Sequence, residues 1–93
     1  MKNPVEMQTK AILVSRMLAI IKKKKWTQKE TAAILQIPQP KVSRLSRGHF
    51  AGFSLEKLIH FLNILNQDVE IVIKNRPVSR KKILGQVSVF ISP

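Results

Sequence analysis

Residues 28–48, QKETAAILQIPQPKVSRLSRG, constrain the fold more than any other part of the chain. Two short amphipathic segments flank a break at Pro38, and a proline disfavours helical backbone in the residue before it. Thr27 and Glu30 stand three apart in the pattern of a capping box, which begins a helix, and Gly48 suits a helix end. The pattern predicts two helices joined by a tight turn, over residues 27–35 and 39–47.

The flanking sequence predicts further elements on both sides of this pair. Apolar residues recur at helical spacing from Leu13 to Ile21, which indicates a helix from Thr9 to about Lys25. Ser54 is suited to cap another helix, from Leu55 to about Asn66. Residues 68–74 and 86–92 alternate between polar and apolar side chains, as strands do. The expected organisation is a flexible N-terminus (1–8), a helical domain (9–67), and C-terminal strands with a basic linker that serve dimerisation (68–93).

The charge of the chain favours a polyanionic partner. Its 93 residues carry 17 Lys and Arg against 5 acids, a net charge of +12, which attracts nucleic acid or an anionic membrane face. No apolar run is long enough for a membrane span, and the first residues lack the apolar core of a signal peptide. We therefore expect a cytoplasmic, nucleoid-associated protein without a membrane role. Residues 54–67 are neutral overall, which indicates an interior or an interface.

Nothing in the sequence indicates an enzyme. The chain has no cysteine, and its two histidines, His49 and His60, stand eleven residues apart without further metal-ligand spacing. Asp68 is its one aspartate, and no acid, base and nucleophile are placed for mutual reach. We expect no catalysis, no metal and no cofactor.

Residues 28–47 resemble the twenty-residue helix-turn-helix motif of the lambda-repressor-like (XRE-type) class. Gln28 stands where this class often places a phosphate-binding glutamine, and Ala32 where a small residue lets the two helices cross closely. The match departs at Gln36, because the class usually has a glycine with positive φ there; a glutamine adopts that geometry at a cost of about 1 kcal/mol. The core positions of the motif are occupied by Leu35, Ile37, Val42 and Leu45.

The resemblance implies that the second helix of the motif enters a DNA major groove. Gln39 can bind adenine in bidentate fashion, Arg44 can bind guanine in the same way, and Pro40 can contact a thymine methyl. The full set of expected base contacts is Gln39, Pro40, Ser43 and Arg44. The expected phosphate contacts are Gln28, Lys29, Lys41, Arg47 and His49. The run Lys22–Lys25 is either a solvated helix end or a phosphate clamp, and Trp26 either packs over the following helix or stacks on a base.

Residues 10–74 also resemble HigA-type antitoxins, a branch of the same class. This resemblance implies a mainly α fold: a four- to five-helix lambda-repressor-like DNA-binding domain with a short C-terminal β-strand or β-hairpin. It implies a homodimer on double-stranded DNA, acting as a transcriptional repressor, or alternatively an antitoxin that neutralises a toxin protein and binds DNA for autoregulation. Nonspecific nucleic-acid binding driven by charge is a third possibility. The residues expected at the dimer or partner contact are Phe61, Ile64, Val69, Ile71 and Ile73.

Overall fold

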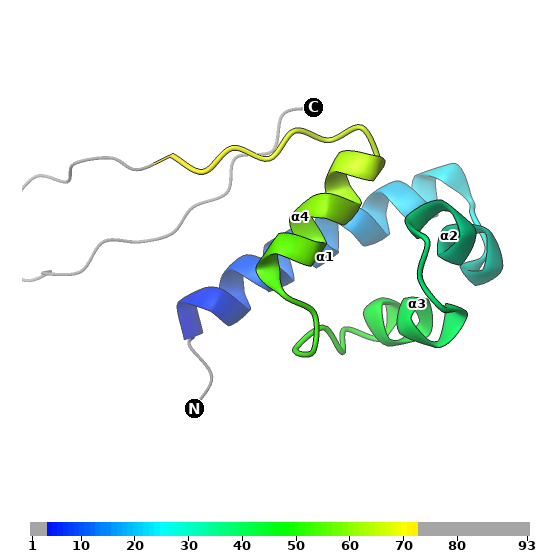
Figure 1. The fold of residues 1–93 in the computed structure, drawn as a ribbon, viewed down its shortest axis with the longest axis horizontal. Helices are drawn as coiled ribbons and strands as arrows, with labels where there is room; N and C mark the ends of the chain where they lie inside the picture. The colour runs from blue at the N-terminus through cyan, green and yellow to red at the C-terminus, as the bar shows by residue number, and fades with distance from the viewer. Residues whose placement is uncertain (1–3, 73–93) are drawn as a thin grey trace, which may run out of the picture.

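The computed structural model describes residues 4–72, which form four helices around one core (Figure 1). They are α1 (Pro4–Lys24), α2 (Gln28–Leu35), α3 (Gln39–Ser46) and α4 (Leu55–Ile64). Helix α4 packs against the long helix α1, and α2 and α3 form a pair beside them. None of the helices in the described part is long and apolar enough to cross a membrane.

Helix α1 begins five residues earlier than the sequence pattern predicts, so residues 4–8 are helical and not frayed. Pro4 suits a first turn, where the missing amide has no intrahelical acceptor to lose. Glu6 lies in the same turn and forms an ion pair with Lys10 at 3.3 Å. Thr9 does not cap the helix, because its hydroxyl donates to the Val5 carbonyl at 2.8 Å within α1.

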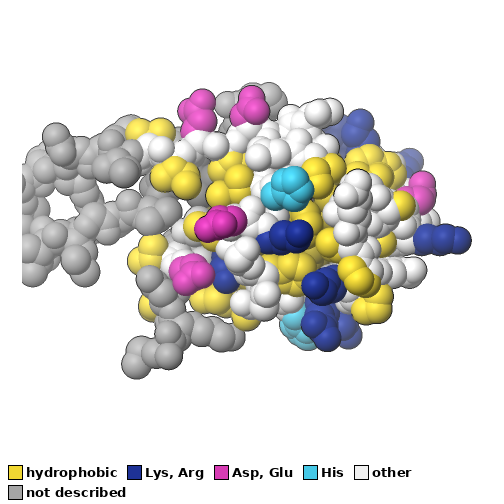
Figure 2. Space-filling model, viewed as in Figure 1, with side chains coloured by type: hydrophobic (Ala, Val, Ile, Leu, Met, Phe, Trp, Pro, Cys, Tyr) yellow, Lys and Arg dark blue, Asp and Glu magenta, His cyan; other side chains and the backbone are white. Residues whose placement is uncertain are grey.

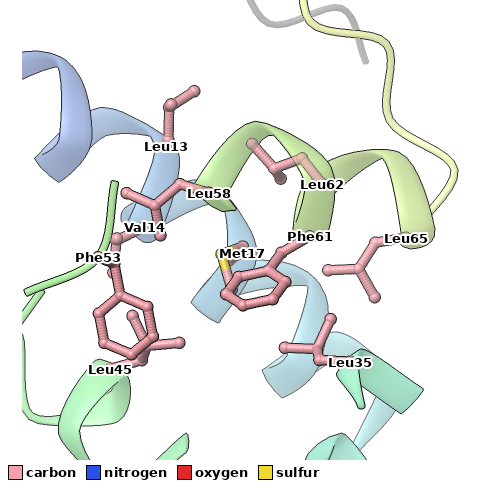
Figure 3. Close-up of a cluster of buried hydrophobic side chains, with 10 residues drawn as sticks. All are labelled: Leu13, Val14, Met17, Leu35, Leu45, Phe53, Leu58, Phe61, Leu62 and Leu65. Atoms are coloured by element: carbon pink, nitrogen blue, oxygen red, sulfur yellow. The ribbon is translucent and has the colours of Figure 1, made fainter. Parts of the chain in front are cut away.

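The core is formed mainly by α1 and α4 (Figure 3). Met17 of α1 lies against the ring of Phe61 from α4, with side chains from α2 and α3 closing the far side. Phe61 is 0% exposed, so its prediction as a dimer contact is wrong: the helix turns this ring into the centre of the domain. The cluster consists of Leu13, Val14, Met17, Leu35, Leu45, Phe53, Leu58, Phe61, Leu62 and Leu65.

Two other predictions concern residues beside the core. Trp26 is half-buried and packs against the cluster, as expected for a residue that covers the start of α2. Ser54 caps α4 as predicted, since its hydroxyl accepts a hydrogen bond from the Lys57 amide at 3.0 Å. Residues 67–72 continue after α4 without helix or strand, so the predicted strand has no counterpart in the described part of its range. Residues 73–74 and the second predicted strand, over 86–92, lie outside the described residues.

Candidate nucleic-acid interface

Helices α2 and α3 are joined by a tight left-handed turn at Gln36. This residue has φ 58° and ψ 44°, the αL conformation that the resemblance to the motif requires at this position. The turn lets the Ile37 amide donate to the Ala32 carbonyl at 3.1 Å, so this carbonyl in the last turn of α2 has a hydrogen-bond donor. Pro38 then precedes the first turn of α3, and Pro40 lies within that turn. The predicted break therefore lies where the sequence placed it.

The start of α2 is fixed by the predicted capping box. The Thr27 hydroxyl accepts from the Glu30 amide at 3.0 Å, and the Glu30 carboxylate accepts from the Thr27 amide, also at 3.0 Å. Hydrogen bonding of the Glu30 carboxylate to Thr27, first to its backbone amide and then to its side chain, lowers the pKa of Glu30 below its ordinary value of 4.5. The carboxylate therefore stays ionised beside the positive end of the helix.

One side of α3 is buried and the opposite side is exposed. Val42 and Leu45 are 4% and 2% exposed and pack toward α2 and the core. The outward side carries the predicted base contacts, because residues three or four apart share a helix face. Of these, Ser43 is half-buried, whereas Gln39, Pro40 and Arg44 are exposed. The structure thus brings all four predicted base-contacting residues onto one accessible surface.

Gln28 is held against the end of α3. Its side-chain amide donates to the Ser46 hydroxyl at 3.3 Å, and that hydroxyl donates to the Ser43 carbonyl at 2.8 Å. Only one of the two amide hydrogens of Gln28 is used in this contact, so the other can donate to a phosphate oxygen. Ser46 was not among the predicted contacts; its position three residues after Ser43, on the side of α3 toward α2, is the one sequence feature that indicates this role.

The end of α3 positions His49. Gly48 has φ 79°, and this turn lets the His49 amide donate to the Arg44 carbonyl at 2.8 Å. Lys41, Arg44 and His49 consequently line one surface groove together with the loop at 50–53. Met7 of α1 lines it too, although it falls in residues 1–8, which were predicted to be flexible. Two predicted phosphate contacts, Lys41 and His49, therefore lie in the same groove as one predicted base contact, Arg44.

Basic side chains gather over α2 and α3, while most acidic ones lie toward the other end of the molecule in the view of Figure 2. Residues 27–53 contain a single acid, Glu30, which is engaged by Thr27. Within residues 4–72, no ion pair involves Lys29, Arg44 or Arg47, although the Arg47 Nε donates to a carbonyl of its own helix at 3.3 Å. These cations therefore remain free for phosphates or bases.

The predicted dimer contacts differ in their burial. Ile64 and Val69 are partly buried and pack against the core, whereas Ile71 is 72% exposed. Ile73 lies outside the described residues. Among residues 4–72 there is also no group of three or more His, Cys, Asp or Glu side chains suited to hold a metal ion.

The fold and the surface of α3 together define a helix-turn-helix domain. A family model for this helix-turn-helix domain matches residues 1–74. A solved structure described as an XRE-family transcriptional regulator is 42% identical, with a TM-score of 0.85, over 95% of this chain and 97% of that one. No relative with a curated functional description matches. The chain belongs to the helix-turn-helix family, of the XRE type.

Proposed function

We propose that this protein is a sequence-specific DNA-binding regulator that represses transcription as a homodimer. The proposal rests chiefly on one observation: Gln39, Pro40, Ser43 and Arg44 share the accessible side of a short helix in a basic motif. An XRE-type fold and a relative described as a transcriptional regulator support it.

The residues divide into two roles by their chemistry. Arg44 and Gln39 carry paired hydrogen-bonding groups that distinguish guanine and adenine in the major groove, where each good bidentate contact discriminates by about 1–3 kcal/mol. Gln28 of α2, Lys41 of α3 and His49 just after α3 can bind phosphates, and such contacts fix the register of α3 on the duplex. Release of counterions from the DNA makes this second contribution dependent on salt. Exposed positive charge at the same end of the domain is added by Lys29 and Arg47.

A homodimer would place two copies of α3 in successive major grooves about 34 Å apart, on an inverted repeat. Occupying such a site within a promoter would block transcription. Ile64, Val69 and Ile71 remain the proposed contact residues, together with Ile73, whereas buried Phe61 is excluded.

A pull-down of genomic fragments at about 150 mM salt, a physiological ionic strength, tests the proposal. We expect enrichment of one inverted repeat. Arg44→Ala removes the bidentate contact, so it should reduce discrimination at one base pair by about 5- to 150-fold. Lys22→Ala is the matched control, expected to weaken all sequences alike. Flat recovery of fragments, or equal effects of both substitutions, would contradict specific recognition.

The alternative is an antitoxin of the HigA type that chiefly neutralises a toxin. A basic toxin would be repelled by a chain of net charge +12, so this charge favours DNA as the main ligand. Co-purification of a toxin at unchanged DNA affinity would establish both roles.

A further inference from the structure

The hydroxyl of Ser46 lies between the start of α2 and the end of α3. Its oxygen accepts a hydrogen bond from the Gln28 side-chain amide at 3.3 Å, and its proton is donated to the Ser43 carbonyl at 2.8 Å. Gln28 and Ser46 are 18 positions apart, and within residues 4–72 theirs is the one side-chain hydrogen bond that joins α2 to α3. Ser46 therefore connects a proposed phosphate contact to the helix proposed to read bases.

The direction of these hydrogen bonds fixes the orientation of the Gln28 amide. A serine hydroxyl has one proton, and the Ser43 carbonyl takes it, so the oxygen of Ser46 can only accept from Gln28. Turning the amide carbonyl toward Ser46 would place two acceptors against each other. The amide has two protons, of which Ser46 takes one. The second proton is therefore presented to a phosphate oxygen in a fixed orientation.

This restraint should contribute to DNA affinity. Gln28 is exposed, and no other side-chain hydrogen bond within the described residues involves its amide. A long polar side chain that is free before binding loses rotamer freedom when it contacts a partner, which corresponds to about a 2- to 12-fold loss of affinity. A side chain that is already held in its binding orientation avoids much of this loss.

The packing of α2 and α3 does not depend on this contact alone. Gln28 and Ser46 lie at the edge of a small cavity of about 50 Å³, whose remaining lining is largely apolar and includes Trp26, Val42 and Leu45. These apolar side chains hold the helices together, so loss of the Ser46 hydroxyl should leave both helices in place. Trp26 is the one tryptophan of the chain, so its fluorescence reports on this packing.

We infer that Ser46 is a positioning residue for DNA binding, which holds the Gln28 amide in the orientation that a phosphate oxygen requires. The inference rests on the proposed function and adds a link between its two parts, because the same hydroxyl is bonded to the backbone of Ser43, a proposed base contact. The Arg47 Nε donates to that carbonyl too, at 3.3 Å. One backbone oxygen at the end of α3 thus orients two side chains proposed to bind phosphate.

A double-mutant cycle in the full-length protein tests this role. The probe is a DNA duplex of random sequence, because a phosphate contact requires no particular base, and fluorescence anisotropy measures the affinity. Ser46→Ala should weaken binding by about 2- to 12-fold in the wild-type background, but by less than about twofold when Gln28 is already alanine. Ser46→Thr keeps a hydroxyl that can bond the same carbonyl, so it should recover most of the affinity. Ser15→Ala makes the same chemical change on an exposed position of α1 and should bind like wild type.

The outcomes separate this inference from the proposed function. Equal losses from Ser46→Ala with and without the Gln28 side chain would overturn the positioning role, and so would a Ser46→Thr variant that binds no better than Ser46→Ala. A shifted Trp26 emission in Ser46→Ala would assign the loss to altered packing and would overturn it as well. A coupled cycle together with flat recovery of genomic fragments would support the positioning role and contradict specific recognition. An uncoupled cycle in a protein that enriches one inverted repeat would do the reverse.

Discussion

Replacing Gln36 with glycine should stabilise the helix-turn-helix motif. Gln36 has φ 58° and ψ 44°, a region in which the Cβ of an ordinary residue approaches the following carbonyl oxygen. The side chain is exposed and makes no hydrogen bond within the described residues, so little is lost when it is removed. A glycine adopts this backbone without the steric cost.

Two opposing contributions set the size of the effect. Relief of the αL conformation is worth about 1–2 kcal/mol. The greater freedom of glycine in the unfolded chain lowers the free energy of unfolding by about 0.4–1 kcal/mol. We therefore expect the free energy of unfolding of Gln36→Gly to rise by about 0.5–1 kcal/mol, which for a domain of this size raises Tm by about 2–8 °C.

Urea denaturation at one fixed protein concentration measures the change, since a dimer links stability to concentration. Lys25 and Asn66 have φ 58° and 62° and serve as parallel sites. Lys25→Gly should raise the free energy of unfolding about as much as Gln36→Gly does. Asn66→Gly should raise it less, because asparagine tolerates the αL conformation. Ala33→Gly is a control with the opposite expected sign. Ala33 is exposed and lies in the middle of α2, so a glycine there should lower the free energy of unfolding by about 1 kcal/mol.

The reasoning would be refuted if Gln36→Gly unfolded at a lower urea concentration than wild type while Ala33→Gly behaved as expected. That result would mean that the glutamine side chain, and not the backbone geometry, dominates at the turn. Affinity for an operator should be unchanged in Gln36→Gly, because the substitution leaves the exposed side of α3 intact.

The remaining predictions concern the cap, the core and the interface. Thr27→Ala removes the hydroxyl of the capping box and should lower the free energy of unfolding by about 1 kcal/mol in urea. Because the pKa of Glu30 is lowered by folding, its stabilising contribution is complete above about pH 4.5 and is lost as pH falls through the lowered pKa; a Glu30→Gln variant should lose this part of the acid dependence of Tm. Phe61→Ala should cost about 3–5 kcal/mol because the ring is fully buried, whereas Ile71→Ala should leave the unfolding of the monomer nearly unchanged. Gln28→Ala should weaken operator binding without changing base preference and should leave the salt dependence unchanged, because the neutral amide neutralises no phosphate; fluorescence anisotropy at several salt concentrations measures both.

The helix-turn-helix motif follows from local sequence alone. The capping box at Thr27 and the glycine end of α3 each depend on contacts between residues at most five apart, so their residue types suffice to predict them. The αL turn at Gln36 was expected only from the resemblance to the motif, because a glutamine does not favour that backbone. The resemblance to the motif placed Val42 and Leu45 in its core, and both side chains are buried. The exposed side of α3, which carries the predicted base contacts, lies opposite that buried side.

Long-range packing settled what the local pattern left open. Helix α4 has apolar residues over most of its circumference, so spacing alone left Phe61 available for a partner contact, and only the packing of α1 put the ring in the core. The N-terminal turn of α1 lacked an apolar pattern, yet its helix extends to Pro4 and brings Met7 to the groove of His49. Residues 68–72 have the alternation of a strand but no strand in one chain, because a strand requires hydrogen-bonding partners that neighbouring residues do not supply.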